Sequence, residues 1–198
     1  MGAPEQNGEA ILIKDLWKIY PQKEGLCVTS EDVENEELVE ELDKGSDAVV
    51  AMKNVSLTVN HGETFIIMGL SGSGKSTLIR CLLRLVEPTS GEIIINGENV
   101  TAMDKKQLVA FRREKIAMVF QHYGLLPHRT VLENVAFGLK LRGEDGEERM
   151  KKARDAIGKV GLKDWGDYYP ACLSGGMRQR VGIARALVMD APILLMDE

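Results

Sequence analysis

The feature that most constrains this chain is a glycine-rich loop between an apolar run and a helical pattern. The run is Phe65–Met68, the loop is Gly69–Thr77 (GLSGSGKST), and apolar residues at helical spacing follow from Leu78. This order predicts a buried strand, a tight loop and a helix. Such a loop can turn successive backbone N–H groups toward one anion at the positive end of the helix dipole. The sequence therefore predicts a cradle for a polyphosphate.

Side chains and glycines of this loop have distinct expected roles. The glycines permit close approach of the backbone to phosphate oxygens, which a Cβ would obstruct. We expect Lys75 to reach the β- and γ-phosphates of a nucleoside triphosphate and Ser76 to bind Mg²⁺. The predicted nucleotide-binding residues of the loop are Gly69, Ser71, Gly72, Ser73, Gly74, Lys75, Ser76 and Thr77.

Composition limits the partners of the chain. Its 198 residues carry a net charge of −5, which provides no general attraction to nucleic acid, and we expect no nucleic-acid partner. The three cysteines lack a C-x-x-C pair, which disfavours a disulfide framework and zinc. No signal-peptide pattern is present, and no apolar run approaches the roughly 18 residues that span a bilayer. Any membrane role is therefore expected to be peripheral.

Periodicity and turn residues predict an α/β fold in several parts. Alternating or continuous apolar residues predict an antiparallel β part over 11–68 and 92–100, with an Asn-Gly hairpin at 96–97. Residues 65–120 and 190–198 are assigned to a core with a parallel sheet, including buried strands at 65–68, 116–120 and 193–196. Residues 122–173 are assigned to an inserted helical subdomain, which continues into a helix over 174–189.

An acidic insertion over residues 22–47 separates the first two strands. Its few apolar residues have helical spacing, which favours a short amphipathic helix. A solvated, partly disordered loop is the alternative, because the segment is dominated by carboxylates.

Polar residues follow two of the predicted parallel strands. Gln121 comes after the strand at 116–120, and Asp197 and Glu198 come after the strand at 193–196. Ligands of open α/β folds lie at the carboxyl edge of the sheet, so Asp197 and Gln121 are expected to join Ser76 at Mg²⁺. Glu198 would polarise an attacking water, and Glu198, Gln121 and Lys75 are the predicted catalytic residues.

A second candidate anion site begins the helix over 174–189. Ser174 is a typical N-cap, and Gly175 and Gly176 leave the first helical N–H groups accessible. One triphosphate cannot easily use two helix termini of the same subunit. We therefore expect two copies arranged head to tail, with two ATP molecules at their interface and Ser174, Gly175 and Gly176 contacting the partner's nucleotide.

Taken together, these motifs resemble those of the ATPase subunits of ABC transporters, over nearly everything from Ile11 to Glu198. The resemblance implies a RecA-like P-loop NTPase core, in which Gly69–Thr77 is the Walker A loop and Leu173–Met177 is the ABC signature. It also implies that Gln121 is the Q-loop glutamine, Asp197 the Walker B aspartate and Glu198 the catalytic glutamate. Tyr20 resembles the aromatic residue that stacks on adenine, and a buried strand-end tyrosine is the alternative.

A narrower resemblance concerns the transported solute. Residues 69–77, 116–121, 127–138 and 173–180 are similar to glycine betaine/proline uptake ATPases, and Met177 fits that group. This implies a peripheral subunit at the cytoplasmic face of the membrane that powers import of quaternary amines. A transmembrane permease and, indirectly, a solute-binding protein are the implied partners, with residues 123–134 presenting an apolar groove to a permease helix.

The same resemblance implies that such ATPases continue beyond Glu198 into a strand that lies between the Walker A and Walker B strands. Without that strand, both neighbours would lack backbone partners. We therefore expect the chain as given to bind ATP weakly and hydrolyse it poorly. A soluble ABC ATPase not coupled to transport and a non-catalytic nucleotide-binding fragment remain open alternatives.

Overall fold

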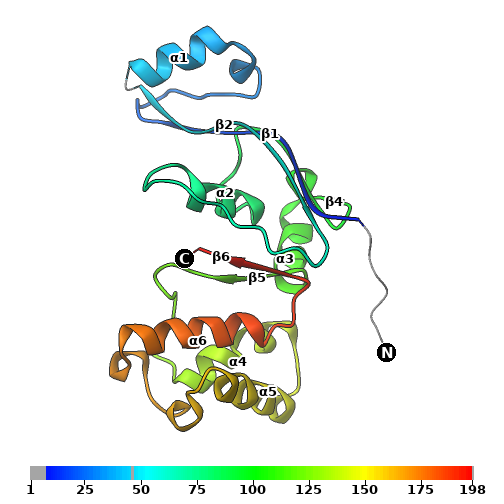
Figure 1. Cartoon of the computed structure of the whole chain (residues 1–198), viewed down its shortest axis with the longest axis vertical. Helices are drawn as coiled ribbons and strands as arrows, with labels where there is room; N and C mark the ends of the chain where they lie inside the picture. Colours follow the sequence, from blue (N-terminus) through cyan, green and yellow to red (C-terminus); the bar gives the residue numbers. More distant parts are fainter. Residues whose placement is uncertain (1–7, 46, 198) are drawn as a thin grey trace. The chain divides into compact units, whose positions relative to one another are not determined.

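The computed structural model describes residues 8–45 and 47–197, which fall into two compact units. Unit 1 comprises residues up to Asp104, and unit 2 begins at Lys105 (Figure 1). Unit 1 contains an antiparallel sheet and unit 2 a parallel strand pair with helices, so the predicted α/β class is confirmed. The grouping of 65–120 with 190–198 into one core stays a prediction. Among the described helices, none combines the length and apolar character of a bilayer-crossing segment.

The sheet of unit 1 has four strands in the order β2-β1-β3-β4. They are β1 (Glu9–Pro21), β2 (Ala48–Asn60), β3 (Ser90–Ile95) and β4 (Glu98–Asn99), and every neighbouring pair is antiparallel. The predicted hairpin at 96–97 is confirmed, since Asn96 and Gly97 have φ values of 49° and 79°. Two left-handed residues in succession give a turn whose twist matches the flanking strands.

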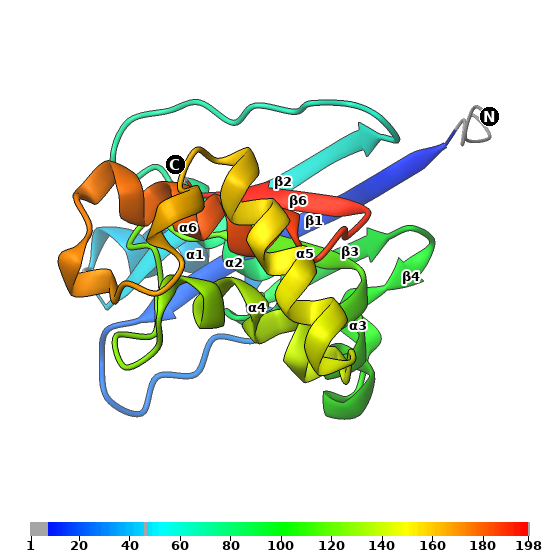
Figure 2. The same ribbon diagram turned by 90° about the horizontal axis from the view of Figure 1, so that it is seen from below.

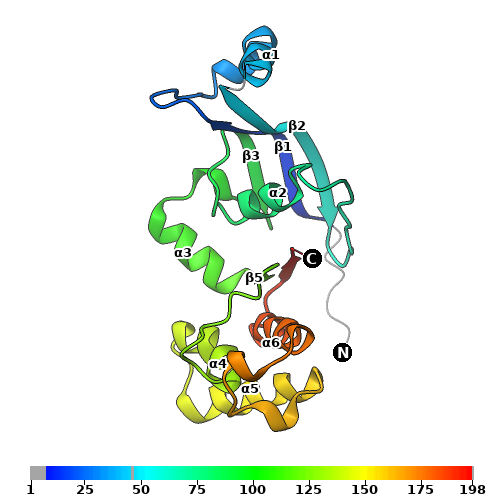
Figure 3. The same ribbon diagram turned by 90° about the vertical axis from the view of Figure 1, so that its left-hand side faces the viewer.

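The acidic insertion contains a short helix, which confirms the first of the two predicted alternatives. It holds a 3₁₀ turn (Asp32–Glu34) and α1 (Glu36–Lys44), whose first turn is capped by the Asn35 side chain. Val33 and Val39 are buried against Trp17, Ile19 and Ala48, so the helix is anchored by a few apolar contacts while its carboxylates face solvent. Figures 1 and 3 show α1 and α2 (Lys75–Leu82) on different sides of the sheet.

The predicted buried strand at 65–68 is wrong. No residue from Glu63 to Leu70 belongs to a strand, and Ile66 and Met68 are 74% and 80% exposed. An apolar run becomes a buried strand only when neighbouring strands pair with its backbone and other elements cover its faces. In unit 1 every described strand belongs to the antiparallel sheet, which does not include this segment.

Unit 2 contains one parallel strand pair. The strands β5 (Ile116–Val119) and β6 (Ile193–Met196) pair in register from Ile116 opposite Ile193 to Val119 opposite Met196. All four residues of β5 are buried. The strand ends one residue earlier than predicted, at Val119, and Phe120 is 40% exposed. The predictions of strands at 116–120 and 193–196 are thus confirmed apart from that last residue.

Helices make up most of unit 2. They are α3 (Lys105–Glu114), α4 (Val131–Arg142), α5 (Gly146–Lys159) and α6 (Gly175–Leu187), with 3₁₀ turns at Lys163–Trp165 and Pro170–Cys172. The predicted capping box is present, because the Thr130 hydroxyl accepts from the Glu133 N–H and the Glu133 carboxylate accepts from the Thr130 N–H. α6 packs against β5, whereas α5 lies on the far side of the bundle from the strands (Figures 1 and 2).

Candidate functional site

The glycine loop of unit 1 turns sharply and is pressed against β2. Gly72 and Gly74 have φ values of 83° and 87°, in the left-handed region that side chains rarely adopt. A Cβ on Gly74 would overlap the carbonyl oxygen of Ala51 in β2, whereas a Cβ on Gly72 would meet nothing within 4 Å. The loop therefore needs glycine at 72 for backbone conformation alone and at 74 for conformation and close packing.

The Lys75 ammonium lies against this loop. Its Nζ donates to the carbonyl oxygens of Gly69 and Leu70 at 2.9 and 2.7 Å, and lies 3.4 Å from the Ser73 hydroxyl. Lys75 is also the first residue of α2, so the ammonium and the helix N-terminus place positive charge beside the same loop. The exposed loop, the helix start and the cation together fit the requirements of an anion such as a phosphate.

The remaining loop residues surround this point. Ser71 and Ser73 are exposed, while Ser76 and Thr77 are half-buried in the first turn of α2. The Ser73 N–H donates to the Leu70 carbonyl at 3.2 Å, which closes the loop on itself. The hydroxyl groups thus lie around the start of a helix that carries a lysine. Hydroxyl oxygens are suitable ligands for Mg²⁺, and the lysine is a suitable partner for phosphate.

Tyr20 lies near the end of β1, opposite Val49 of β2. Tyr20 stays in the sheet despite the acidic insertion that follows it. Pro21 pairs with Ala48, so the insertion begins and ends at the same end of the β1–β2 pair. The Lys18 Nζ is 4.7 Å from the centroid of the Tyr20 ring. The ring is half-buried, and adenine stacking by Tyr20 stays a prediction.

In unit 2, Gln121 and Asp197 leave the strand pair at the same edge. The Asp197 N–H donates to the Val119 carbonyl at 3.0 Å, which extends the β5–β6 ladder by one step. Asp197 is 4% exposed, and Gln121 lies on the exposed loop that follows Phe120. A buried carboxylate at the carboxyl end of a parallel strand is a position from which a cation can be held. Glu198 lies outside the described residues.

The start of α6 has the predicted capping. The Ser174 hydroxyl accepts from the Met177 N–H at 3.3 Å, and Gly175 begins the helix. Ser174 and Gly176 are exposed, and a Cβ on Gly176 would meet nothing within 4 Å. The dipole end of α6 is thus accessible in this chain.

Two side chains that support the loop after β5 were not predicted from the sequence in that role. Asn134 is fully buried, and its side chain hydrogen bonds to Leu126, Arg129 and Thr130, so it supports the loop from within. It therefore cannot form part of the surface groove predicted for 123–134. Arg185 was also missed, whereas Tyr123 was predicted only as the first residue of that groove. A polar residue inside the apolar pattern of a helix was the only available signal for Asn134 and Arg185.

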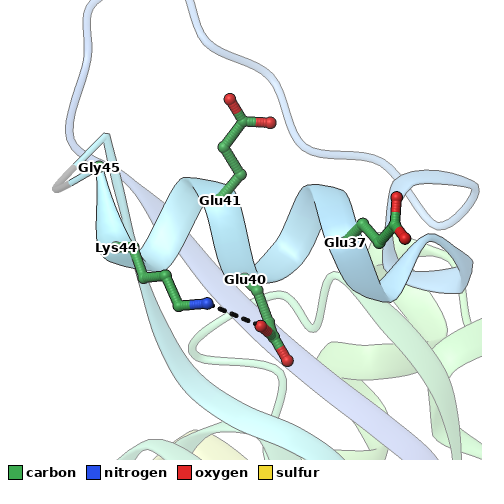
Figure 4. Close-up of a pocket in the computed structure, with 5 residues that line it drawn as sticks. All are labelled: Glu37, Glu40, Glu41, Lys44 and Gly45. Atoms are coloured by element: carbon green, nitrogen blue, oxygen red, sulfur yellow. Dashed lines mark hydrogen bonds and ion pairs between the residues drawn. The ribbon is translucent and has the colours of Figure 1, made fainter.

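A shallow hollow lies elsewhere, on α1 (Figure 4). It has a volume of about 490 Å³ and is lined by Glu37, Glu40, Glu41, Lys44 and Gly45. Lys44 and Glu40 form an exposed ion pair at 2.8 Å, which lowers the pKa of Glu40 and raises that of Lys44. None of the predicted site residues lines this hollow.

Comparison with known proteins agrees with the motifs of both units. The family model described as ABC transporter matches residues 52–198. The glycine betaine/carnitine transport ATP-binding protein GbuA of Listeria monocytogenes is 46% identical over 95% of this chain and 47% of its own length. The glycine betaine/proline betaine transport system ATP-binding protein ProV of Escherichia coli is 48% identical over 94% of this chain and 46% of its own length.

A solved structure gives the same assignment. The ATP-binding cassette MJ0796, a dimer bound to ADP and Pi, matches with a TM-score of 0.79 and 35% identity over 94% of this chain and 72% of that one. The chain belongs to the ABC transporter family. It spans about half the length of the curated relatives described above.

Proposed function

We propose that this chain is the nucleotide-binding part of an ATP-hydrolysing subunit that powers an ABC importer. The observation that carries the proposal is the Walker A loop of unit 1, with Lys75 at the start of α2 and Gly74 pressed onto β2. The ATP-binding relatives and the cassette bound to ADP and Pi support it.

Each proposed site residue has a task in phosphate binding and hydrolysis. Lys75 exchanges its carbonyl partners at Gly69 and Leu70 for the β- and γ-phosphate oxygens, where its charge forms stronger hydrogen bonds. The backbone N–H groups of the loop and of the first turn of α2 bind the same oxygens, because the helix N-terminus is the positive end of the α2 dipole. Tyr20 stacks on the adenine.

The chemistry of the reaction is positioning and charge stabilisation rather than covalent catalysis. Ser76, Gln121 and Asp197 are the proposed Mg²⁺ ligands, and their hydroxyl, amide and carboxylate oxygens are suitable for that hard cation. When bound, Mg²⁺ neutralises charge on the phosphates. Glu198 and Gln121 orient the attacking water.

The remaining proposals concern assembly and solute. A second copy contributes Ser174, Gly175 and Gly176 to the nucleotide, because the start of α6 is a capped and accessible helix terminus. The subunit sits peripherally at the cytoplasmic face of the membrane, on a transmembrane permease supplied by a solute-binding protein. Glycine betaine or another quaternary amine is the proposed solute, supported by the names of GbuA and ProV.

The nucleotide site is tested by binding measurements on the full chain. Isothermal titration with Mg²⁺ and ATP compares the unaltered protein, Lys75→Ala, and Lys14→Ala, which removes an exposed lysine of β1. We expect Lys75→Ala to weaken binding about 100-fold, because it removes a charged partner of two phosphates, and Lys14→Ala to leave binding unchanged. Equal binding by Lys75→Ala and the unaltered protein would contradict the proposal.

The transport role requires a second experiment. Co-purification from membranes identifies the partner, and ATP-dependent uptake of radiolabelled glycine betaine into vesicles identifies the solute. Glu198→Gln is expected to trap a dimer with ATP, seen by size-exclusion chromatography, only if the hydrolytic machinery is complete, because the substitution then stops hydrolysis after the two copies close. Recovery of the protein with ribosomes or DNA instead of a permease would favour the ATPase that acts outside transport.

A further inference from the structure

The loop that carries Gln121 is attached to α6 by the side chain of Arg185. The guanidinium Nη1 donates to the Gly124 carbonyl at 2.6 Å, and Nη2 donates to the Tyr123 carbonyl at 2.7 Å. Arginine presents its N–H groups in a rigid planar fork, so one side chain fixes two successive peptide units. The contact joins residues 61 and 62 positions apart in the chain.

The backbone at this point has an unusual conformation. Tyr123 and Gly124 have φ values of 59° and 56°, so two successive residues are left-handed. A left-handed tyrosine is costly and persists only when its surroundings hold it. This conformation turns both carbonyl groups toward Arg185, and the two hydrogen bonds stabilise it.

The Tyr123 side chain provides a second attachment along the same helix. Its ring lies beneath the Arg178 guanidinium, whose Cζ is 5.7 Å from the ring centroid. A Cβ placed on Gly175 would lie 3.4 Å from the Tyr123 hydroxyl, so the ring reaches the first residue of α6. Tyr123 thus contacts α6 from its start to the level of Gly182, where a Cβ would lie 3.8 Å from the Tyr123 carbonyl oxygen.

Arg185 is half-buried, so its guanidinium has lost part of its hydration. Burial removes water from the guanidinium and lowers its pKa. Well-formed hydrogen bonds offset the hydration that a half-buried cation loses, and both of these carbonyl contacts are well formed. Arg180 of the same helix gives a contrast, because it is exposed and makes one 3.3 Å bond to the Val160 carbonyl.

We propose that Arg185 is a positioning residue that fixes the Gln121 loop to α6, with Tyr123 as the second point of attachment. A ligand held at Ser174–Gly176 then acts on Gln121 through Tyr123, since both ends of that tyrosine contact α6. The loop and α6 therefore move together, and Gln121 lies two residues before Tyr123, where the loop is attached. The consequence for catalysis rests on the proposed ATPase function, whereas the attachment itself does not.

Hydrogen exchange measured by mass spectrometry tests the attachment on the nucleotide-free full chain. Without Arg185, the Tyr123 and Gly124 N–H groups, which donate to Phe120 and His122 carbonyls, lose the constraint on their conformation. We expect Arg185→Met to accelerate exchange at these amides about tenfold or more, because two hydrogen bonds are lost. Arg185→Lys keeps the charge and is expected to restore part of the protection.

Arg180→Met is the matched control, and it is expected to leave exchange in residues 121–126 unchanged. Two results would overturn the proposal. One is unchanged exchange at Tyr123 and Gly124 in Arg185→Met. The other is an equal acceleration across α4, α5 and α6, which would assign Arg185 to general stability.

Turnover gives the functional arm of the test. If the loop positions Gln121 for hydrolysis, Arg185→Met lowers kcat about tenfold or more while KM for ATP stays nearly constant, because small misplacement of a catalytic group affects the reaction step more than binding. An equal rise in KM would contradict the positioning role. Absence of turnover in the unaltered protein would count against the proposed function alone, and the exchange measurements would still decide the attachment.

Discussion

Residues 63–74 of unit 1 and 116–130 of unit 2 begin with similar sequence patterns and end in different structures. Both contain an apolar run, at 65–68 and 116–120, that continues into a loop with a predicted catalytic or binding role. In unit 2 the run becomes β5, pairs with β6 and is buried, and its loop is held by Asn134 and Arg185. In unit 1 the run forms no strand and is exposed, and the loop is shaped by glycines and Lys75.

The difference teaches that an apolar run specifies a buried strand only together with its partners. Local sequence was sufficient to predict the glycine loop, because its left-handed positions require glycine, whereas its packing against Ala51 of β2 was not predicted. The strand before it depends on backbone pairing from distant segments. The two regions therefore differ in what holds them, and substitutions should affect them differently.

The largest difference in stability is expected when one isoleucine is shortened in each apolar run, at 116–120 and 65–68. Ile116 is 4% exposed and Ile66 is 74% exposed. Ile116→Ala should lower the free energy of unfolding by about 2–5 kcal/mol, as cavities in packed cores do, and Ile66→Ala by at most about 0.5 kcal/mol. The sequence has two tryptophans, Trp17 in unit 1 and Trp165 in unit 2. Variants that keep only one of them report the unfolding of each unit by fluorescence during denaturant titration.

Similar losses of stability for Ile116→Ala and Ile66→Ala would contradict the difference in packing between the two runs.

The loop of unit 2 is expected to depend strongly on Asn134. Asn134→Ala leaves the carbonyl groups of Leu126, Arg129 and Thr130 without this buried donor. Each hydrogen bond lost from a poorly hydrated group lowers stability. We expect the free energy of unfolding to fall by about 1–3 kcal/mol in total. Thermal denaturation measures it, with Lys151→Ala on the exposed face of α5 as the control. A stability equal to that of the control would show that the loop is held without Asn134.

The loop of unit 1 should depend on its two left-handed glycines to unequal degrees. Gly72→Ala and Gly74→Ala both introduce a Cβ at positive φ, which costs about 1–2 kcal/mol. Only the Cβ at position 74 also overlaps Ala51, so Gly74→Ala should be the more destabilising and should weaken ATP binding more. Calorimetry and nucleotide titration measure the two effects. Equal behaviour of the pair would mean that contact with β2 does not shape the loop.

The smallest effect concerns Cys81 of α2. Burial raises the pKa of its thiol from 9.0 to about 11, whereas Cys27 and Cys172 are exposed. The folded protein therefore keeps the Cys81 thiol protonated at pH values where the unfolded chain would lose that proton. The free energy of unfolding is expected to decrease as pH rises from about 9 toward 11. At pH 8 we expect a thiol reagent to modify Cys27 and Cys172 quickly and Cys81 only after unfolding, as mass spectrometry of digests would show. Fast modification of Cys81 would mean that α2 opens from the sheet.

Sequence patterns predicted several helix starts of unit 2 and one hairpin of unit 1 well, because their signals are local. The capping box at Thr130 and Glu133, the N-cap at Ser174 and the hairpin at Asn96-Gly97 all depend on residues within four positions of one another. The strand at 65–68 was predicted from the same kind of signal and was wrong, because pairing is not a local property. The attachment of Tyr123 to Arg185 was not predicted, since no pattern indicates contact between segments so distant in sequence.

By itself the sequence determined the glycine loop, the helix starts, the order of the elements and the membership of the ABC transporter family. These follow from short-range rules of backbone conformation, capping and periodicity, and from motif spacing. Only the tertiary structure decided which apolar runs are strands, that Asn134 is internal to its loop, and that Arg185 fixes the Gln121 loop. Burial and hydrogen-bond pairing are set by neighbours that the chain brings together only on folding, and for that reason they could not be read from residue patterns.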